Sequence, residues 1–262
     1  MALTDPSPAV LDFGARVAEA YAKLLVCGNA DRESGLGGKL FYAGELDGEG
    51  RALVVAANIA GAATLAASAD RAAQKQAIRD GIADFLVTSL DEALRILKNQ
   101  LRKRETVAVS VAMEPAAMER EMNERGVAPD LFRGEVAVAA LHEALLLEQG
   151  KIDEADLNGA PGLVVWRADS ARHQDLALLD RIALTCLDAN EWAARRWLRL
   201  APRYLGRLAQ GMRLLRTEHE FVARFSEQLK VRVECGEITF PYEIRAYIRG
   251  AEEKICFEPE KP

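Results

Sequence analysis

The chain has 262 residues, of which 50% are hydrophobic and 28% are charged, and its net charge at pH 7 is −6. This length and apolar content allow a sizeable core in one large domain or two small ones, and they exclude an intrinsically disordered chain. The acidic balance excludes a global field that attracts nucleic acid or an anionic membrane, so we expect neither as a partner, and any anion site must be local.

The chain ends and the cysteines indicate the cellular compartment. No apolar run is long enough to cross a bilayer, and residues 1–8 lack the features of a signal peptide. We therefore expect a cytoplasmic protein. The four cysteines are scattered without a CxxC pair, which predicts reduced, mostly buried thiols, and the three isolated histidines form no metal-ligand pattern, so we expect no metal site.

The first half of the chain alternates short apolar runs with helical patterns. A helix is predicted first, over residues 11–26. The predicted strands that follow are residues 39–43, 64–68, 84–88, 106–112 and 130–132, and the helices between them are residues 51–62, 70–80, 89–104 and 115–125. Asp70 and Ser89 are N-cap residues, and Pro115 suits a first helical turn. This alternation predicts an α/β fold with a doubly wound, mostly parallel, Rossmann-like sheet.

The pattern changes after residue 135. One helix is predicted to residue 149 and a single strand over residues 162–166. Residues 170–230 are predicted to be almost wholly helical, and two β-like runs, residues 231–240 and 242–248, predict a terminal β-hairpin.

We place a domain boundary near residue 150. Residues 1–150 form the predicted Rossmann-like domain, and residues 151–262 form a mainly helical region with C-terminal strands that can pack on the same core.

A glycine-rich turn follows the first predicted strand. Gly44, Gly48 and Gly50 lie between this strand and an alanine-rich helix, where backbone amides can face a phosphate. The spacing is not GxGxxG, and three carboxylates in the loop repel a pyrophosphate. Two interpretations remain open, because the glycines either make a tight connection or bind a nucleotide or another small anion.

Other candidate sites also have two interpretations. Asp70 is either a helix cap or a ribose ligand. Glu114 and Asp84 are either solvated acids or a carboxylate pair at the carboxyl edge of the sheet. His173, close to Asp169, is either a surface residue or a general acid/base. No GxSxG or P-loop motif occurs, so the catalytic residues are unknown.

Residues 190–216 form the basic region of this acidic chain. They contain seven arginines interleaved with Trp192, Trp197 and Tyr204. The apolar residues recur at helical spacing, which favours a packed helix with a solvated basic face. The alternative is a surface that binds a phosphate-bearing ligand or an acidic partner.

Three stretches carry a resemblance to a known family. They are GGKLFYAGELDGEGRALVVAANIAGAATLAA, TSLDEALRILKN and TVAVSVAMEPAAMEREMNERGVAPDLF. From residue 38 to residue 132 the chain resembles the central NAD-binding domain of urocanase (urocanate hydratase). The most specific signatures are the A-G-loop-G turn, AGA at residues 60–62, LDEAL at residues 90–94 and RGVAPD at residues 125–130.

The resemblance implies a cofactor, NAD or another nucleotide. It implies cofactor binding at the turn that contains Gly44, Gly48 and Gly50. The family's acidic ribose ligand falls near Ser68 in this sequence, with Asp70 as a nearby substitute.

The sequence also departs from the family. The turn after the first strand is glycine-dense in the family, whereas bulky and acidic residues stand there in this sequence. Met113 and Glu114 stand where the family has a Gly-Asn pair. No stretch matches the family's catalytic cysteine and tyrosine regions. We therefore expect a urocanase-related protein that binds a nucleotide or small anion and lacks urocanate hydratase activity.

Two other functions remain open. The alternative is a non-catalytic interaction or oligomerisation module in which the ancestral pocket is closed, with a homodimer as the expected assembly. The third is an enzyme that acts on a nucleotide-like substrate through Asp169, His173 and nearby arginines.

Overall fold

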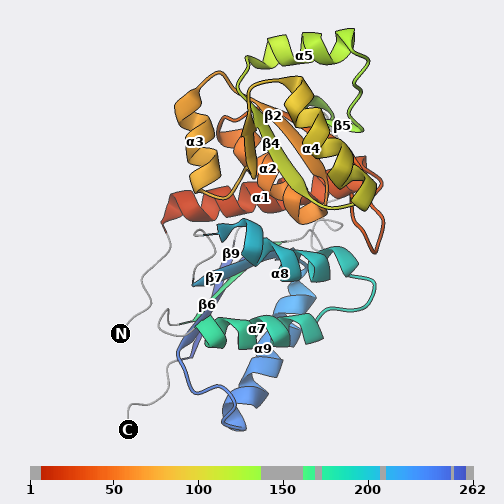
Figure 1. Cartoon of the computed structure of the whole chain (residues 1–262). Helices are drawn as coiled ribbons and strands as arrows, with labels where there is room; N and C mark the ends of the chain where they lie inside the picture. Colours follow the sequence, from red (N-terminus) through yellow and green to blue (C-terminus); the bar gives the residue numbers. More distant parts are fainter. Residues whose placement is uncertain (1–6, 137–161, 169–172, 207–210, 249–250, 258–262) are drawn as a thin grey trace, which may run out of the picture. The chain divides into compact units, whose positions relative to one another are not determined.

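The computed structural model describes residues 7–136, 162–168, 173–206, 211–248 and 251–257 (Figure 1). The chain divides into two compact units. We name Arg16–Gln149 the Rossmann-like unit, and Met1–Ala15 together with Gly150–Pro262 the C-terminal unit. The division falls inside the first helix, α1 (Pro8–Cys27).

The Rossmann-like unit contains a five-stranded parallel sheet with the order β3-β4-β2-β1-β5. Its strands are β1 (Leu40–Glu45), β2 (Ala63–Ala67), β3 (Phe85–Val87), β4 (Val107–Val111) and β5 (Leu131–Phe132). Every residue of β2 and β4 is buried. This is expected for inner strands that helices cover on both faces. The predicted α/β, doubly wound, parallel fold is confirmed.

Four helices connect these strands: α2 (Gly48–Ala60), α3 (Arg71–Arg79), α4 (Leu90–Lys103) and α5 (Pro115–Glu124). Local signals set their ends. Asp70 and Ser89 accept backbone amides at the starts of α3 and α4, and Pro115 is the first residue of α5. Gly61 ends α2 in the left-handed conformation.

The strand order determines which face each helix covers. The connections through α2 and α3 run toward the β3 edge of the sheet, whereas those through α4 and α5 run back toward β5. Right-handed crossovers therefore place α2 and α3 on one face and α4 and α5 on the other. Neighbouring strands β2 and β4 continue into helices on opposite faces, α3 and α5. The gap between their carboxyl ends is the topological switch point, where open α/β sheets bind ligands.

The core on the α4 and α5 face consists of interdigitating apolar side chains. Leu90 and Leu97 from α4 and Met118 from α5 pack against Leu65 and Val109 of the sheet. Each fully buried side chain of this size stabilises the fold by roughly 1.5–3 kcal/mol. This packing holds α5 against the sheet, although α5 connects β4 with the distant strand β5.

The C-terminal unit contains a four-stranded antiparallel sheet with the order β7-β6-β8-β9. Its elements are β6 (Gly162–Ala168), α7 (His173–Thr185), α8 (Trp192–Tyr204), β7 (Met212–Thr217), α9 (His219–Glu234), β8 (Tyr242–Ile248) and β9 (Ala251–Phe257). A terminal hairpin is present as predicted, but β8 pairs with β9 and not with the predicted run over residues 231–240. Trp166 packs edge-on against Phe225, with ring centroids 5.3 Å apart.

Two details of the prediction for this unit are wrong. Residues 212–217 form β7 and not part of a helix, because Gly206 and Gly211 both have positive φ and interrupt the helical pattern. The predicted β run over residues 231–240 is also wrong, because its first residues complete α9. Over so short a stretch, the spacing of the apolar residues fits the period of a helix as well as that of a strand.

The burial of the cysteines differs from the prediction. All four are free, but Cys235 and Cys256 are exposed, Cys27 is half-buried and only Cys186 is buried. Cys235 caps the end of α9 and Cys256 lies in the edge strand β9, and both are positions that solvent reaches. Burial raises the pKa of the Cys186 thiol. None of the helices described here is long and apolar enough to cross a membrane.

Candidate functional site

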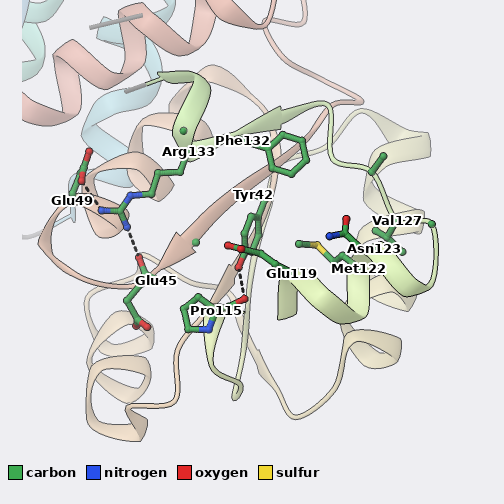
Figure 2. A pocket seen from close by; sticks show the side chains of 14 residues that line it. Tyr42, Glu45, Glu49, Pro115, Glu119, Met122, Asn123, Val127, Phe132 and Arg133 are labelled. Carbon is green, nitrogen blue, oxygen red and sulfur yellow. Dashed lines mark hydrogen bonds and ion pairs between the residues drawn. The ribbon is translucent and has the colours of Figure 1, made fainter. Parts of the chain in front are cut away.

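A pocket of about 720 Å³ lies in the Rossmann-like unit (Figure 2). It is lined by the end of β1, the first turn of α2, α5 with the loop that follows it, and the residues from Phe132 to Gly134. All lining residues belong to one compact unit. The pocket therefore opens beside the glycine-rich turn, under α5.

Tyr42 lies at the centre of the pocket wall, with Met122 and Phe132 nearby (Figure 2). The Tyr42 side chain is 3% exposed, and its hydroxyl donates to the Pro115 carbonyl oxygen at 3.4 Å. Burial raises the pKa of the phenol, and the charge and hydrogen bond of Glu119 and the charge of Glu45 raise it further. Tyr42 is therefore a neutral hydrogen-bond donor at physiological pH.

The glycines of the turn have different geometric roles. Gly44 lines the pocket and has φ +68°, a left-handed conformation. A Cβ on Gly50 would lie 1.8 Å from the Glu45 carbonyl oxygen, so no side chain fits there. Gly48 begins α2, and a Cβ there would meet its nearest neighbour at an ordinary 3.8 Å. The tight turn between β1 and α2 therefore requires glycine at positions 44 and 50.

A carboxylate of the chain itself occupies the N-terminus of α2. Asp47 is the N-cap residue, and its Oδ1 accepts from the Gly50 amide at 2.7 Å. A phosphate bound at a helix N-terminus uses the same donors and the same dipole. The Asp47 carboxylate therefore stands where the resemblance implies a pyrophosphate.

Arg133 neutralises this carboxylate. Its Nη1 and Nη2 atoms bind the two Asp47 carboxylate oxygens at 3.2 and 3.0 Å, and Nη2 also binds Glu49 at 2.5 Å. Nη1 donates to the Glu45 carbonyl oxygen at 3.4 Å (Figure 2). Burial raises the pKa of Asp47, but the hydrogen bonds from Arg133 and the Gly50 amide outweigh it and lower that pKa below its usual value.

Ser68 and Asp70 both take part in the cap of α3. The Ser68 hydroxyl accepts from the Asp70 amide at 3.2 Å, and Asp70 Oδ1 accepts from the Ala72 amide at 2.7 Å. This geometry is that of a helix cap. Neither residue lines the pocket.

Gln74 fills the switch point between β2 and β4. Its side chain is 0% exposed, and its Nε2 donates to the carbonyl oxygens of Ser68 and Val111, each at 2.9 Å. Its Oε1 has no hydrogen-bond partner in the part of the chain that the structure describes. The sequence analysis missed Gln74. The available signal was a glutamine four residues after the Asp70 cap, on the inner face of the helix.

The residues of the turn do not fit the pyrophosphate of NAD. The Gly50 amide already binds Asp47, and the guanidinium of Arg133 already binds Asp47 and Glu49. The other charges at the turn are the Glu45 carboxylate, which repels a phosphate, and the Arg16 guanidinium, whose Nη1 lies 3.8 Å from the Cβ position of Gly48. At the switch point, the buried Gln74 side chain fills the space between the two strands, and its Nε2 donates to a carbonyl oxygen after each of them.

Of the two interpretations of Asp84 and Glu114, the carboxylate pair is wrong. Asp84 lies before β3, and its Oδ2 accepts from the Ala108 amide at 2.8 Å, near the amino end of β4. Glu114 lies beyond the carboxyl end of β4, at the start of α5. The two acids are at opposite ends of a parallel sheet.

The general acid/base interpretation of His173 involves residues that the structure does not describe. His173 is the first residue of α7, and its neighbours Asp169 and Ser170 lie outside the described residues, as does His142. Within the described ranges, no group of three or more His, Cys, Asp or Glu side chains is arranged to hold a metal ion.

The basic region divides into α8 and β7, and several of its arginines have structural partners. Arg195 Nη1 donates to the carbonyl oxygens of Leu184 and Leu187 at 3.0 and 2.8 Å, which caps the end of α7. Arg213 Nε binds Asp180 at 2.9 Å. Arg207 lies outside the described residues. These contacts favour the structural interpretation for Arg195 and Arg213.

A comparison with known families supports the resemblance. A family model described as the urocanase Rossmann-like domain matches residues 17–147, half of the chain. The match spans all five strands of the parallel sheet and every residue of the pocket. The predicted resemblance over residues 38–132 is confirmed and extends further in both directions.

Proposed function

The chain belongs to the urocanase family through its Rossmann-like domain, and on this basis we propose that it binds a small molecule in the pocket beside α5 and lacks urocanate hydratase activity. The family domain implies a nucleotide ligand, but the donor set at the turn does not fit a pyrophosphate. The proposal therefore concerns the pocket and not an NAD site.

The pocket itself is the observation that carries this proposal. Its volume of about 720 Å³ is within the range of roughly 300–1,000 Å³ that is typical of ligand sites. Apolar side chains, among them Met122, Val127 and Phe132, line it together with a few polar groups such as Tyr42 and Glu119. This combination, at the ends of two parallel strands, is typical of small-molecule sites.

Ligand binding is tested by nuclear magnetic resonance with a library of small fragments and the ¹⁵N-labelled chain. We expect binding fragments to shift the amide signals of Tyr42, Met122 and Phe132. Val127→Trp should weaken these shifts because the larger side chain occupies the part of the pocket around residue 127, and Val231→Trp, at an exposed position in α9, should not. Fragment shifts that avoid the pocket, or that Val127→Trp leaves unchanged, would contradict the proposal.

Separate observations support the proposed absence of urocanate hydratase activity. The turn does not fit the pyrophosphate, and Ser68 stands where the family has an acidic ribose ligand. An assay that follows urocanate absorbance, with NAD added, tests this directly. We expect no consumption of urocanate, and turnover would overturn this part of the proposal.

A second candidate function is self-association through the β3 edge of the sheet. Strand β3 is an edge strand, and its Phe85 and Leu86 side chains are 46% and 40% exposed, with Ile78 of α3 also exposed. An apolar edge strand can pair with another strand. Antiparallel pairing of β3 with a second copy is self-complementary, so it would give a closed two-fold dimer.

Sedimentation velocity over a range of concentrations tests this dimer. We expect a monomer–dimer equilibrium that Leu86→Lys shifts to monomer, because a lysine on the edge opposes strand pairing. Val231→Lys is the control, at an apolar residue of similar exposure in α9. A chain that stays monomeric at every concentration, or a dimer that Leu86→Lys leaves unchanged, would exclude the β3 contact.

A further inference from the structure

The pocket carries more negative than positive charge. Glu45, Glu49 and Glu119 line it, and among its lining residues Arg133 is the one basic side chain. Arg133 pairs with Glu49 and, outside the lining, with Asp47. Its positive charge is therefore already balanced within the turn.

Glu119 and Glu45 have no comparable compensation. Glu119 lies beside Tyr42 (Figure 2), and Glu45 Oε1 accepts from the Leu46 amide at 3.1 Å. Neither carboxylate has a basic side chain as an ion-pair partner in the described ranges. Both carboxylates belong to residues that line the pocket, and their charges raise the pKa of Tyr42, which lines it as well.

The rest of the wall suits an apolar body. Met122 is 2% exposed, and Val127 and Phe132 flank it (Figure 2). Phe132 presents an aromatic ring, which attracts a cation near its face. The pocket thus combines an apolar surface, an aromatic ring and uncompensated carboxylates.

We propose that this pocket binds an organic cation, a protonated amine or nitrogen heterocycle on an apolar body, with the charged nitrogen beside Glu119 and the body against Met122 and Val127. This inference rests on the proposed function and specifies its ligand class. Phosphate and carboxylate ligands are rejected, because the uncompensated carboxylates repel them.

Three probes of similar size and shape test the charge preference: phenethylamine, 3-phenylpropionate and the uncharged 3-phenylpropanol. Each is titrated into the ¹⁵N-labelled chain at low ionic strength, and the signals of Tyr42 and Met122 are followed. We expect phenethylamine to bind tightest and to weaken with added salt, because exposed charges are screened.

Glu119→Gln removes one charge and keeps the shape of the side chain. We expect it to weaken phenethylamine binding by about fivefold, the effect of a partly exposed ion pair, and to leave 3-phenylpropanol unchanged. Glu124→Gln, at an exposed position on the same helix but outside the pocket lining, is the matched control.

The outcomes separate the two proposals. If 3-phenylpropionate binds as tightly as phenethylamine, or if Glu119→Gln leaves amine binding unchanged, the cation preference is wrong and small-molecule binding stands. If none of the probes shifts the pocket signals while fragments of other classes do, the cation preference is likewise wrong. If no probe or fragment shifts these signals, the proposed function fails and this inference fails with it.

Discussion

The β1–α2 turn and the pocket beside α5 are adjacent in the Rossmann-like unit, yet their chemistry differs. At the turn, Asp47 and Arg133 satisfy the helix N-terminus and each other. In the pocket, Glu119 and Glu45 lack basic partners in the described chain, and about 720 Å³ stays open. The difference teaches that a Rossmann-like fold can be kept while the helix N-terminus after its first strand is bound by the chain's own side chains.

Substitution of Gly50 should have the largest effect. Gly50→Ala places a Cβ 1.8 Å from the Glu45 carbonyl oxygen, so the turn must shift. The free energy of unfolding should therefore fall by about 3 kcal/mol or more. Gly48→Ala is the control, because its Cβ has room, and it should change stability by less than about 0.5 kcal/mol. Urea titration measures both. Equal stabilities for the two variants would show that the turn is not close-packed.

Gln74→Leu tests whether the switch point is closed by hydrogen bonds. The change removes the Nε2 donor from the carbonyl oxygens of Ser68 and Val111, of which Val111 keeps the Ser68 amide as a donor at 3.1 Å. We expect a loss of about 1–2 kcal/mol in the free energy of unfolding. Gln76→Leu, on the same helix, is an exposed control. A Gln74→Leu variant as stable as the native chain would mean that these carbonyl groups find other donors, such as water.

Arg133→Gln tests the neutralisation of the turn. It leaves Asp47 and Glu49 close together without a guanidinium, and we expect a loss of about 1 kcal/mol, reduced because these side chains are partly exposed to solvent. Added salt should recover part of the loss. A loss that salt does not change would indicate a packing role for Arg133.

The ion pair between Asp47 and Arg133 also predicts that the free energy of unfolding depends on pH. The folded-state pKa of Asp47 is depressed, so its contribution to stability is present above the ordinary pKa of 3.8 and is lost as the pH falls below it. We expect Arg133→Gln to flatten the acid limb of the stability curve in this window. An acid limb identical to that of the native chain would contradict the assigned role of Arg133.

Tyr42→Phe should have the smallest effect on stability. It removes the 3.4 Å hydrogen bond to the Pro115 carbonyl oxygen, and we expect a change below about 1 kcal/mol. Phenethylamine should still bind, because Glu119 keeps its charge. Loss of amine binding in this variant, followed by nuclear magnetic resonance, would make Tyr42 a required ligand group.

Local signals explain what the sequence predicted correctly. Asp70, Ser89 and Pro115 act within one turn of the helices that they begin, so their positions predict those helices without knowledge of the fold. The five parallel strands followed from apolar runs between these helices. Strand β7 was missed because its apolar residues continue a helical spacing across Gly206 and Gly211.

The site depends on contacts that are distant in sequence. Arg133 meets Asp47 across 86 residues, and Gln74 reaches Val111 across 37. No spacing within one element encodes such a contact. The sequence therefore predicted the turn and its carboxylates, but not that Arg133 neutralises them, nor that the open pocket lies under α5.

The most direct test of the account compares NAD with phenethylamine on one ¹⁵N-labelled sample. The amides of Asp47 and Gly50 report on the turn, and those of Tyr42 and Met122 report on the pocket. The account predicts that phenethylamine shifts the pocket signals and that NAD at millimolar concentration shifts neither set. NAD-induced shifts at Gly50 that saturate would show that the turn accepts a pyrophosphate, and would contradict the claim that Asp47 and Arg133 close it.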